Sequence, residues 1–297
     1  MRRLCRYSLS RLALCGIFLL VCAAGAMEQD PTQRAFLGPD GQLLPFSTDA
    51  EALAFLADAD VLSMDPIPTG VTHPRKVLLE KDGVRAHAVF RVVDEIHEET
   101  RLSDGRLRQR LRDSAILEVA AYKLSIMLGM TTVPPTVERR IGREHGSLQL
   151  WIENTLTETD RRLSDSGPSN LLRLSRDIQT MRAFDILVGN DDRNLGNILY
   201  EHDTWRLWMI DHTRTFQAFY GDPDFSELHW CERTLWERLQ ALTRQEVMAE
   251  LDEYLSGHEI DSLFERRDAL VDHIRSLIDE RGAGAVLYET ESKKDSG

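Results

Sequence analysis

Oxygen-bearing side chains that suit a metal ion are concentrated in one short part of the chain. They are Asp191, Asp192, Asn197 and Asp211. Two apolar runs, 198–200 and 205–210, lie among them and are typical of strands joined by a turn at 202–203. Carboxylates gathered at strand ends are poor core material, but they suit a hard cation, and Mg²⁺ in phosphate chemistry is usually held by one or two carboxylates plus the nucleotide. A loop Asp, a nearby Asn and a further Asp after a strand pair also fit a phosphoryl-transfer site.

Three other interpretations of this segment stay open. Asn190, Asp192, Asn194 and Glu201 imitate the spacing of a calcium loop, but Leu195 stands where the sharp turn needs glycine. The Asp and Asn side chains could instead serve turns and helix caps. A metal-dependent hydrolase could use the same carboxylates.

The first 26 residues have the pattern of an export signal. Four arginines precede an apolar run that starts at Leu12, and the segment ends in Ala24-Gly25-Ala26, which is typical of a cleavage site. The run is short for a membrane span of roughly 20 residues, so a retained anchor is the alternative. We predict a signal peptide at 1–26, cleaved near Ala26, and an exported protein in a periplasm, a secretory lumen or the medium. We expect no membrane contact beyond this signal.

Charge and cysteine content limit the partners and the means of stabilisation. Loss of the four leader arginines takes the formal net charge from −13 to −17. Such an acidic surface argues against nucleic acid or anionic lipid as a general partner. Cys231 is the one cysteine beyond the leader, so an intramolecular disulfide is excluded and stability must come from the core. The oligomeric state does not follow from the sequence.

The part of the chain before residue 153 has mainly strand-like patterns. Residues 27–47 form a lead-in without a core of its own, and a capping box at 48–51 opens a short helix. A strand hairpin with its turn at Asp82-Gly83 follows from Lys76. The charged stretch 95–112 is predicted as a loop that runs into a helix.

That next helix is predicted from about Ser114 to Gly129 and carries Glu118 among apolar residues. A buried strand is expected at 146–152. A lone Glu on a helix usually belongs to a solvated face, whereas a carboxylate close to a buried seam needs a cationic partner.

After residue 153 the pattern becomes helical, with one long amphipathic helix at 170–187 and two or three more within 234–281. Strands and helices do not alternate in the way that would build a parallel sheet. We therefore predict an α+β protein with two lobes: an antiparallel-sheet N-lobe at 48–153 and a larger, mainly helical C-lobe at 154–290. Residues 291–297 are predicted as a disordered tail.

Five segments occur in an order that chance would rarely produce: Leu117-Glu-Val-Ala-Ala-Tyr, Val133-Pro-Pro-Thr-Val, Gly146-Ser-Leu-Gln-Leu, Gly189-Asn-Asp-Asp-Arg-Asn-Leu-Gly-Asn and Ile210-Asp-His-Thr-Arg-Thr-Phe. Through them the chain resembles the atypical kinases of the secretory pathway, the Golgi casein kinase family and its bacterial relatives, over roughly residues 49–289. More distantly it resembles phosphatidylinositol kinases and HipA-like kinases. The resemblance implies the two-lobed kinase fold.

The resemblance also implies roles for single residues. Asp192 corresponds to the catalytic-loop Asp, while Asn197 and Asp211 correspond to metal ligands. Glu118 resembles the helix Glu that pairs with a basic strand residue or approaches the metal.

The expected nucleotide site comes from the N-lobe and the hinge. Arg91 and Lys76 stand where the family has basic residues that hold phosphates, and the turn at Gly70 resembles its phosphate-covering loop. Residues Trp151, Ile152 and Glu153 resemble the hinge, whose backbone binds adenine.

The activity implied by the resemblance is transfer of the γ-phosphate of ATP, with Mg²⁺ or Mn²⁺, to a protein hydroxyl or a glycan. Two positions depart from the family pattern. Asn194 replaces a His, and Arg91 replaces a Lys, whose compact ammonium differs from the planar guanidinium fork. The alternative is therefore a pseudokinase-like module that binds a nucleotide or a partner.

Overall fold

The structure is a computed structural model, which describes residues 35–68, 73–101, 105, 107–191, 193–218 and 222–289 and, within these, not the side chains of 108 and 109. Four sequence predictions lie outside the described residues: the signal peptide at 1–26, the tail at 291–297, the Gly70 turn and Asp192.

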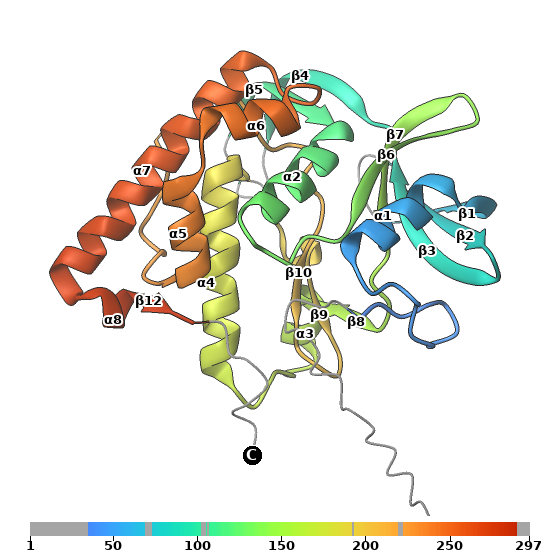
Figure 1. Ribbon diagram of the computed structural model, residues 1–297, viewed down its shortest axis with the longest axis horizontal. Coiled ribbons are helices and arrows are strands. Elements are labelled where there is room, and N and C mark those ends of the chain that lie inside the picture. The colour runs from blue at the N-terminus through green and yellow to red at the C-terminus, as the bar shows by residue number, and fades with distance from the viewer. Residues whose placement is uncertain are drawn as a thin grey trace, which may run out of the picture. The chain divides into compact units, whose positions relative to one another are not determined.

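A five-stranded antiparallel sheet forms the N-lobe (Figure 1). Its strands, in spatial order, are β1 (Asp60–Pro66), β2 (Arg75–Lys81), β3 (Val84–Arg91), β7 (Glu144–Leu150) and β6 (Thr136–Ile141). The predicted hairpin is formed by β2 and β3, with Val77 opposite Ala88, and the predicted buried strand is β7. Alternation along β2 and β3 turns one apolar face of the sheet inward.

Helix α1 (Asp49–Asp58) contacts β6 and β7 of this sheet and closes its apolar face. The predicted capping box is present, because the Thr48 side chain accepts from the Glu51 backbone N–H and the Glu51 side chain accepts from the Thr48 N–H. Phe55 and Leu56 of α1 share a core cluster with Phe90 of β3. Local capping and burial of apolar area therefore act together to hold α1 in place.

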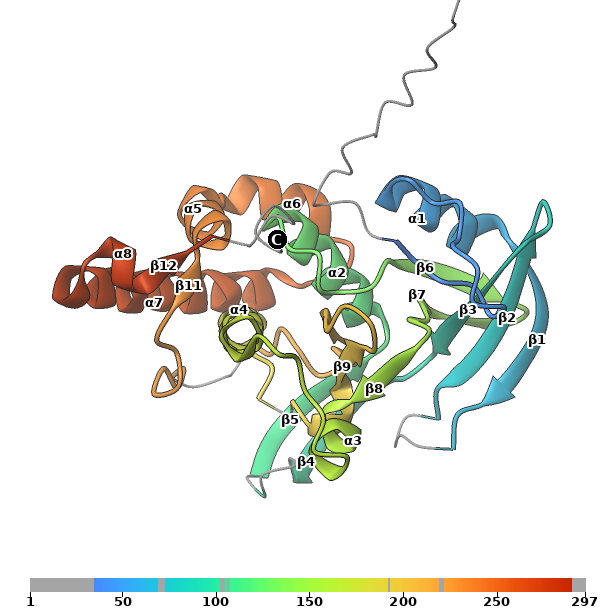
Figure 2. The ribbon, with the colours of Figure 1, turned by 90° about the horizontal axis from the view of Figure 1, so that it is seen from below.

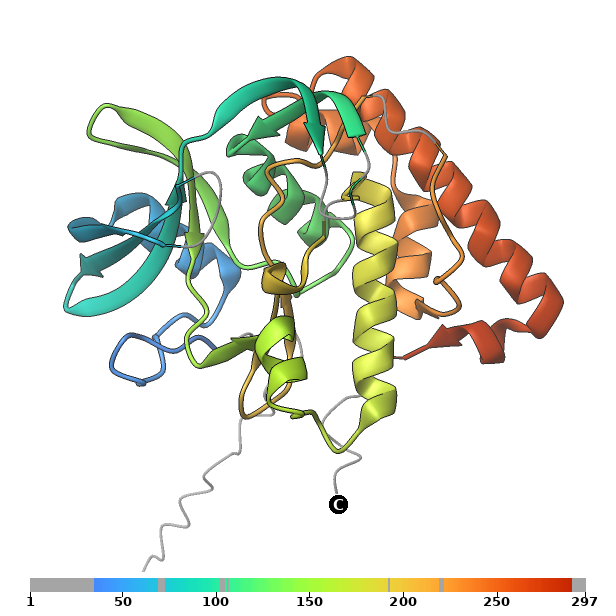
Figure 3. The ribbon, with the colours of Figure 1, turned by 180° about the vertical axis from the view of Figure 1, so that it is seen from behind.

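The stretch 95–112 is not a loop, and the prediction there was wrong. It forms an antiparallel hairpin of β4 (Asp94–Arg101) and β5 (Leu107–Ser114). Figure 3 shows this hairpin extending from the sheet toward the helices of the C-lobe. The strand pattern is hidden in the sequence because few apolar side chains mark it. Leu111 is buried, whereas Ile96 is 61 % exposed.

Helix α2 (Ile116–Met127) follows the hairpin and confirms the predicted helix. Its chain leaves the helix through Gly129, whose φ of 72° is in the left-handed region that favours glycine. Eight of its residues are buried, including Glu118.

The C-lobe is mainly helical, and two of its helices, α4 (Leu171–Val188) and α7 (Gly257–Arg281), pack against each other (Figures 1 and 2). The remaining elements are β8 (Thr155–Thr157), α3 (Glu158–Leu163), the 3-10 helix η1 (Leu195–Asn197), β9 (Ile198–Glu201), β10 (Leu207–Met209), β11 (Cys231–Glu232), α5 (Arg233–Ala241), α6 (Arg244–Leu251), α8 (Ala283–Val286) and β12 (Leu287–Tyr288). Helix α4 is the predicted long helix, and β9 with β10 is the predicted strand pair.

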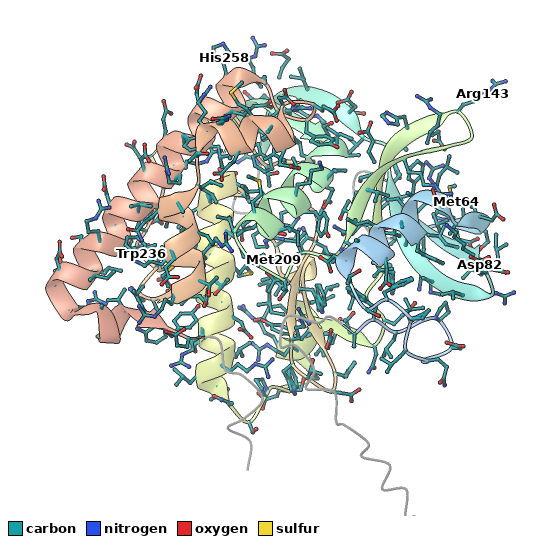
Figure 4. All side chains as sticks on the ribbon, viewed as in Figure 1. Met64, Asp82, Arg143, Met209, Trp236 and His258 are labelled. Atoms are coloured by element: carbon teal, nitrogen blue, oxygen red, sulfur yellow. The ribbon has the colours of Figure 1, made fainter. Side chains whose placement is uncertain are left out.

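The larger cluster of buried apolar side chains joins α2 to the helices and strands of the C-lobe. Met209 lies inside the molecule in Figure 4, whereas Asp82, Arg143 and His258 project from its outside. None of the helices in the described ranges is long and apolar enough to cross a bilayer.

Candidate functional site

The residues that share one site come from four separate elements. Arg91 ends β3, Glu118 lies in the first turn of α2, Asn197 ends η1, and Asp211 follows β10. The Arg91 Nε lies 3.6 Å from Glu118 Oε1 and 3.9 Å from Asp211 Oδ1. Asn197 Nδ2 donates to Asp211 Oδ2 at 3.2 Å. The structure therefore brings four of the predicted site residues together, with Glu118 close to Asp211 as the two-lobed arrangement requires.

Glu118 is fully buried and remains ionised. Its Oε1 accepts from the His212 backbone N–H at 3.0 Å, and its Oε2 accepts from Gln149 Nε2 at 3.3 Å. Burial raises the pKa of Glu118, but the positive charge of Arg91 and then the hydrogen bond from the His212 backbone outweigh it, so the pKa falls to about 2. A permanent negative charge therefore lies beside Arg91.

Arg91 is 5 % exposed and has unused hydrogen-bonding capacity. Its Nε and Nη1 are buried and make no hydrogen bond within the described part of the chain. The distances to Glu118 and Asp211 are too long for hydrogen bonds. An unpaired N–H of a buried charged group is costly, and a guanidinium fork suits phosphate oxygens. The Arg91 environment thus fits a phosphate group.

The backbone around Arg91 is held by a close approach of Gly146 on β7. A Cβ at Gly146 would lie only 1.8 Å from the Arg91 carbonyl oxygen. Only glycine therefore allows β7 to lie this near the end of β3. The position of Arg91 therefore depends on glycine at position 146.

Asp211 and Asn197 are the predicted metal ligands, and both carry side-chain oxygens. The Asp211 side chain is 36 % exposed, and its backbone has a φ of 63°, a left-handed conformation that Asp tolerates better than most residues. Within the described ranges, no three His, Cys, Asp or Glu side chains are grouped as a metal site. Asp211 and the Asn197 amide oxygen nevertheless fit a cation that takes its other ligands from nucleotide phosphates and water, as Mg²⁺ usually does.

Sequence reasoning missed the Arg193 network that supports these ligands. Arg193 Nε and Nη2 donate to both carboxylate oxygens of Asp185, at 3.0 and 2.7 Å. Its Nη1 donates to the backbone oxygens of Ile210, at 2.6 Å, and Asn197, at 3.3 Å. Burial lowers the pKa of Arg193, but the Asp185 carboxylate outweighs this and raises it.

The signal that could have revealed this network is Asp185 itself. It lies on the buried side of α4 between Phe184 and Ile186, and a buried carboxylate needs a cationic partner. The order of elements argues against the calcium interpretation. In a calcium loop of this kind a second helix follows the loop, whereas here α4 is followed by η1 and the strand β9.

The predicted hinge residues directly follow β7. The Trp151 backbone N–H donates to the His87 oxygen at 3.0 Å, and Glu153 Oε1 lies 2.5 Å from His87 Nδ1. Ile152 is buried in the N-lobe core. Lys76 Nζ lies 4.1 Å from the Trp151 ring centroid, so this lysine packs on Trp151 rather than in the ion-pair group around Arg91.

Comparisons with known proteins place the fold. No family model matches the sequence. A structure of hydra Fam20 with sugar is 16 % identical, with a TM-score of 0.62, and the match covers 83 % of this chain and 95 % of that chain. A structure of the Golgi casein kinase is 14 % identical, with a TM-score of 0.58, over 82 % of this chain and 79 % of that chain. A further structure of that kinase, with Mn and ADP bound, has the same TM-score and 13 % identity, over 82 % and 80 % of the two chains.

A curated protein is also similar in sequence. Phosphatidylinositol 4-kinase gamma 4 of Oryza sativa subsp. japonica is 28 % identical over 185 residues, which are 56 % of this chain and 28 % of that protein. The chain thus matches little more than a quarter of that relative's length. The predicted resemblance to the Golgi casein kinase family and the two-lobed α+β kinase fold are confirmed.

Proposed function

We propose that this protein is an exported atypical kinase that transfers the γ-phosphate of ATP, with Mg²⁺ or Mn²⁺, to a protein hydroxyl or a glycan. The observation that carries the proposal is Arg91, a buried guanidinium with unpaired N–H groups beside Asp211 and Glu118. A nucleotide phosphate would supply the missing acceptors. The Golgi casein kinase structure with Mn and ADP bound supports the choice of ligands.

Each residue of the site has a role in this proposal. Arg91 holds a nucleotide phosphate, and the charge of Glu118 holds Arg91. Asp211 and Asn197 bind the metal, which when bound neutralises phosphate charge. The backbone from Trp151 to Glu153 takes adenine.

Three parts of the proposal concern residues outside this central group. Lys76 moves from Trp151 to a phosphate when nucleotide enters. The Gly70 turn covers the phosphates. Asp192 orients the acceptor hydroxyl and accepts its proton.

The reaction balances without any other reactant. The acceptor oxygen forms a bond to the γ-phosphorus, its proton moves to Asp192, and the bond between the γ-phosphorus and the β,γ-bridging oxygen breaks to release ADP. The protein mainly positions the two substrates and compensates charge. The two acceptor classes follow the names of the neighbours, one a casein kinase and one bound to sugar.

The test combines binding with transfer. ATP and Mn²⁺ at a hundred times the dissociation constant are expected to stabilise the protein by about 2.7 kcal/mol. Labelled γ-phosphate is expected on an acceptor when peptide and glycan mixtures are supplied. Asp211→Asn should lose the metal-dependent part of both signals. Asp82→Asn is the matched control, because Asp82 also has a left-handed backbone but lies in the exposed β2–β3 turn. Equal transfer by parent and Asp211→Asn would refute the assignment.

One observation favours the alternative of a binding module. The bulky Arg91 guanidinium lies close to the proposed metal ligand, with Arg91 Nε 3.9 Å from Asp211 Oδ1. This alternative predicts nucleotide or partner binding without transfer. Arg91→Lys, assayed beside the parent, separates the two. Transfer by the parent excludes the module, whereas binding without transfer by both proteins excludes the kinase.

A further inference from the structure

His212, the residue after Asp211, is completely buried at the boundary of the two lobes. Its ring meets the edge of Phe184 of α4, with centroids 5.9 Å apart and an interplanar angle of 83°. One ring nitrogen faces Arg193 of the C-lobe, and the other faces Glu118 of α2. The imidazole therefore lies between the two polar groups that support the site.

The contact with Arg193 fixes which nitrogen carries the proton. His212 Nε2 lies 3.0 Å from Arg193 Nη2. A guanidinium has only donors, so Nε2 must be the acceptor and the imidazole must be neutral. All five N–H groups of Arg193 then have partners: Asp185 takes two, the backbone oxygens of Asn197 and Ile210 take one each, and His212 Nε2 takes the fifth.

The proton on the other nitrogen then faces Glu118. His212 Nδ1 lies 3.4 Å from Glu118 Oε2 and makes no aligned hydrogen bond within the described residues. The backbone N–H of His212 donates to Oε1 of the same carboxylate at 3.0 Å. His212 thus contacts both oxygens of Glu118, one through its backbone and one through its ring.

We propose that His212 is a positioning residue: Arg193 holds it as the neutral Nδ1–H tautomer, and it fixes Glu118, and through Glu118 the Arg91 guanidinium, beside Asp211. A continuous polar chain from Asp185 through Arg193, His212 and Glu118 to Arg91 then joins the catalytic segment of the C-lobe to α2 and β3 of the N-lobe. Its effect on nucleotide binding rests on the proposed function, whereas the tautomer and the coupling to Glu118 do not.

Nitrogen-15 NMR of labelled histidine tests the tautomer without any ligand. His212→Phe identifies the resonances by their loss, and the parent should show Nδ1 protonated and Nε2 free at neutral pH. Arg193→Lys keeps a cation but removes the guanidinium fork, and it should change which ring nitrogen of His212 is protonated. A ring protonated on Nε2 in the parent would overturn the proposal.

A double-mutant cycle tests whether His212 acts through Glu118. His212→Phe keeps the packing on Phe184 and removes both nitrogens, while His212→Asn retains a donor near the Nδ1 position. Loss of the ring's hydrogen bond with the Arg193 cation and of its contact with the Glu118 carboxylate should weaken Mn–nucleotide binding by about tenfold to a hundredfold in the Phe variant, and less in the Asn variant. The control is His273→Phe, since His273 stacks on Phe225 in a different part of the C-lobe.

In a Glu118→Gln background, His212→Phe should cause little further loss of nucleotide affinity or of unfolding free energy, because the effects of substitutions at contacting residues of one network are not additive. Full additivity in unfolding free energy would overturn the coupling. If the parent binds no nucleotide, the proposed function fails, while the NMR tautomer and the stability cycle still decide the role of His212.

Discussion

At the residue scale, the informative feature is a charged group whose Nε and Nη1 lack hydrogen-bond acceptors within the described part of the chain. Arg91 is buried between two carboxylates at distances beyond hydrogen-bonding range. In a purely structural ion pair, the guanidinium and the carboxylate would be expected to lie within hydrogen-bonding distance, because unmet hydrogen bonds are costly in a buried site. Under the proposed function, the oxygens of a nucleotide phosphate are the missing acceptors, and a planar fork suits them better than an ammonium does.

Gly146→Ala is the sharpest test of how Arg91 is placed. The new Cβ would lie 1.8 Å from the Arg91 carbonyl oxygen, so β7 and the end of β3 must separate. We expect overpacking to cost about 1–3 kcal/mol of unfolding free energy and nucleotide affinity to fall. Gly142→Ala is the comparison, because it lies in the exposed β6–β7 turn with no atom near a Cβ, and its φ of 62° gives backbone strain alone. Loss of stability without loss of affinity would contradict the placement.

The ionisation of Glu118 predicts a pH dependence of stability. Its pKa falls from the ordinary 4.5 to about 2 in the folded protein. A lowered folded-state pKa stabilises the fold above the unfolded value, and this stabilisation disappears as the pH falls through the folded value. The stability gap between the parent and Glu118→Gln should thus be largest above pH 4.5 and shrink toward pH 2. Denaturant titrations across that range provide the measurement, and a constant gap would contradict it.

At the element scale, the β4–β5 hairpin connects Arg91 to Glu118 and is pinned to the segment after Asp211. The Ser114 N–H donates to the Thr213 oxygen at 2.8 Å, and Arg214 Nε donates to the buried Asp113 carboxylate at 2.7 Å. Because α2 begins directly after β5, these bonds fix the start of the helix that carries Glu118. A hairpin with little apolar contact is thereby held by polar contacts.

Gln217→Leu tests this anchoring. The Gln217 side chain accepts from the Arg112 N–H at 3.0 Å and donates to the Arg112 oxygen at 2.9 Å, so leucine leaves both backbone groups unpaired. The expected cost is about 1–3 kcal/mol, with faster hydrogen exchange confined to β5 and the start of α2. Gln240→Leu is the control, because Gln240 is exposed on α5. Unchanged exchange in β5 would show that the hairpin is held by other contacts.

At the scale of the whole molecule, the features that could be predicted from the sequence are those marked by a local pattern of residues. Glu118, Asn197 and Asp211 stand out because polar residues interrupt apolar runs, and their meeting in space follows from the kinase fold. The hairpin is missed because strands without an apolar face lack the alternation that marks them. The His212 network is missed because its members, from separate segments, meet only after folding. The roles of Asp192 and Gly70 and the lobe boundary at 153 stay predictions.

The lead-in before α1 also joins the two lobes. Phe36 is 4 % exposed and belongs to the N-lobe core, while its ring lies 5.8 Å, centroid to centroid, from Trp208 on β10 of the C-lobe. Trp208 is itself fully buried in that cluster. A side chain that fills the space between strands of different lobes stabilises both at once.

Phe36→Ala should therefore lower the free energy of unfolding by more than is expected for a residue near the edge of the fold. Removal of a buried phenylalanine costs about 3–5 kcal/mol. At about 2–4 °C per kcal/mol for a protein of this size, the melting temperature should fall by about 6–20 °C. The matched control is Leu43→Ala, since Leu43 is paired with Leu37 in the same lead-in but is 69 % exposed. Calorimetry that finds the two variants equally stable would show that the lead-in does not hold the lobes together.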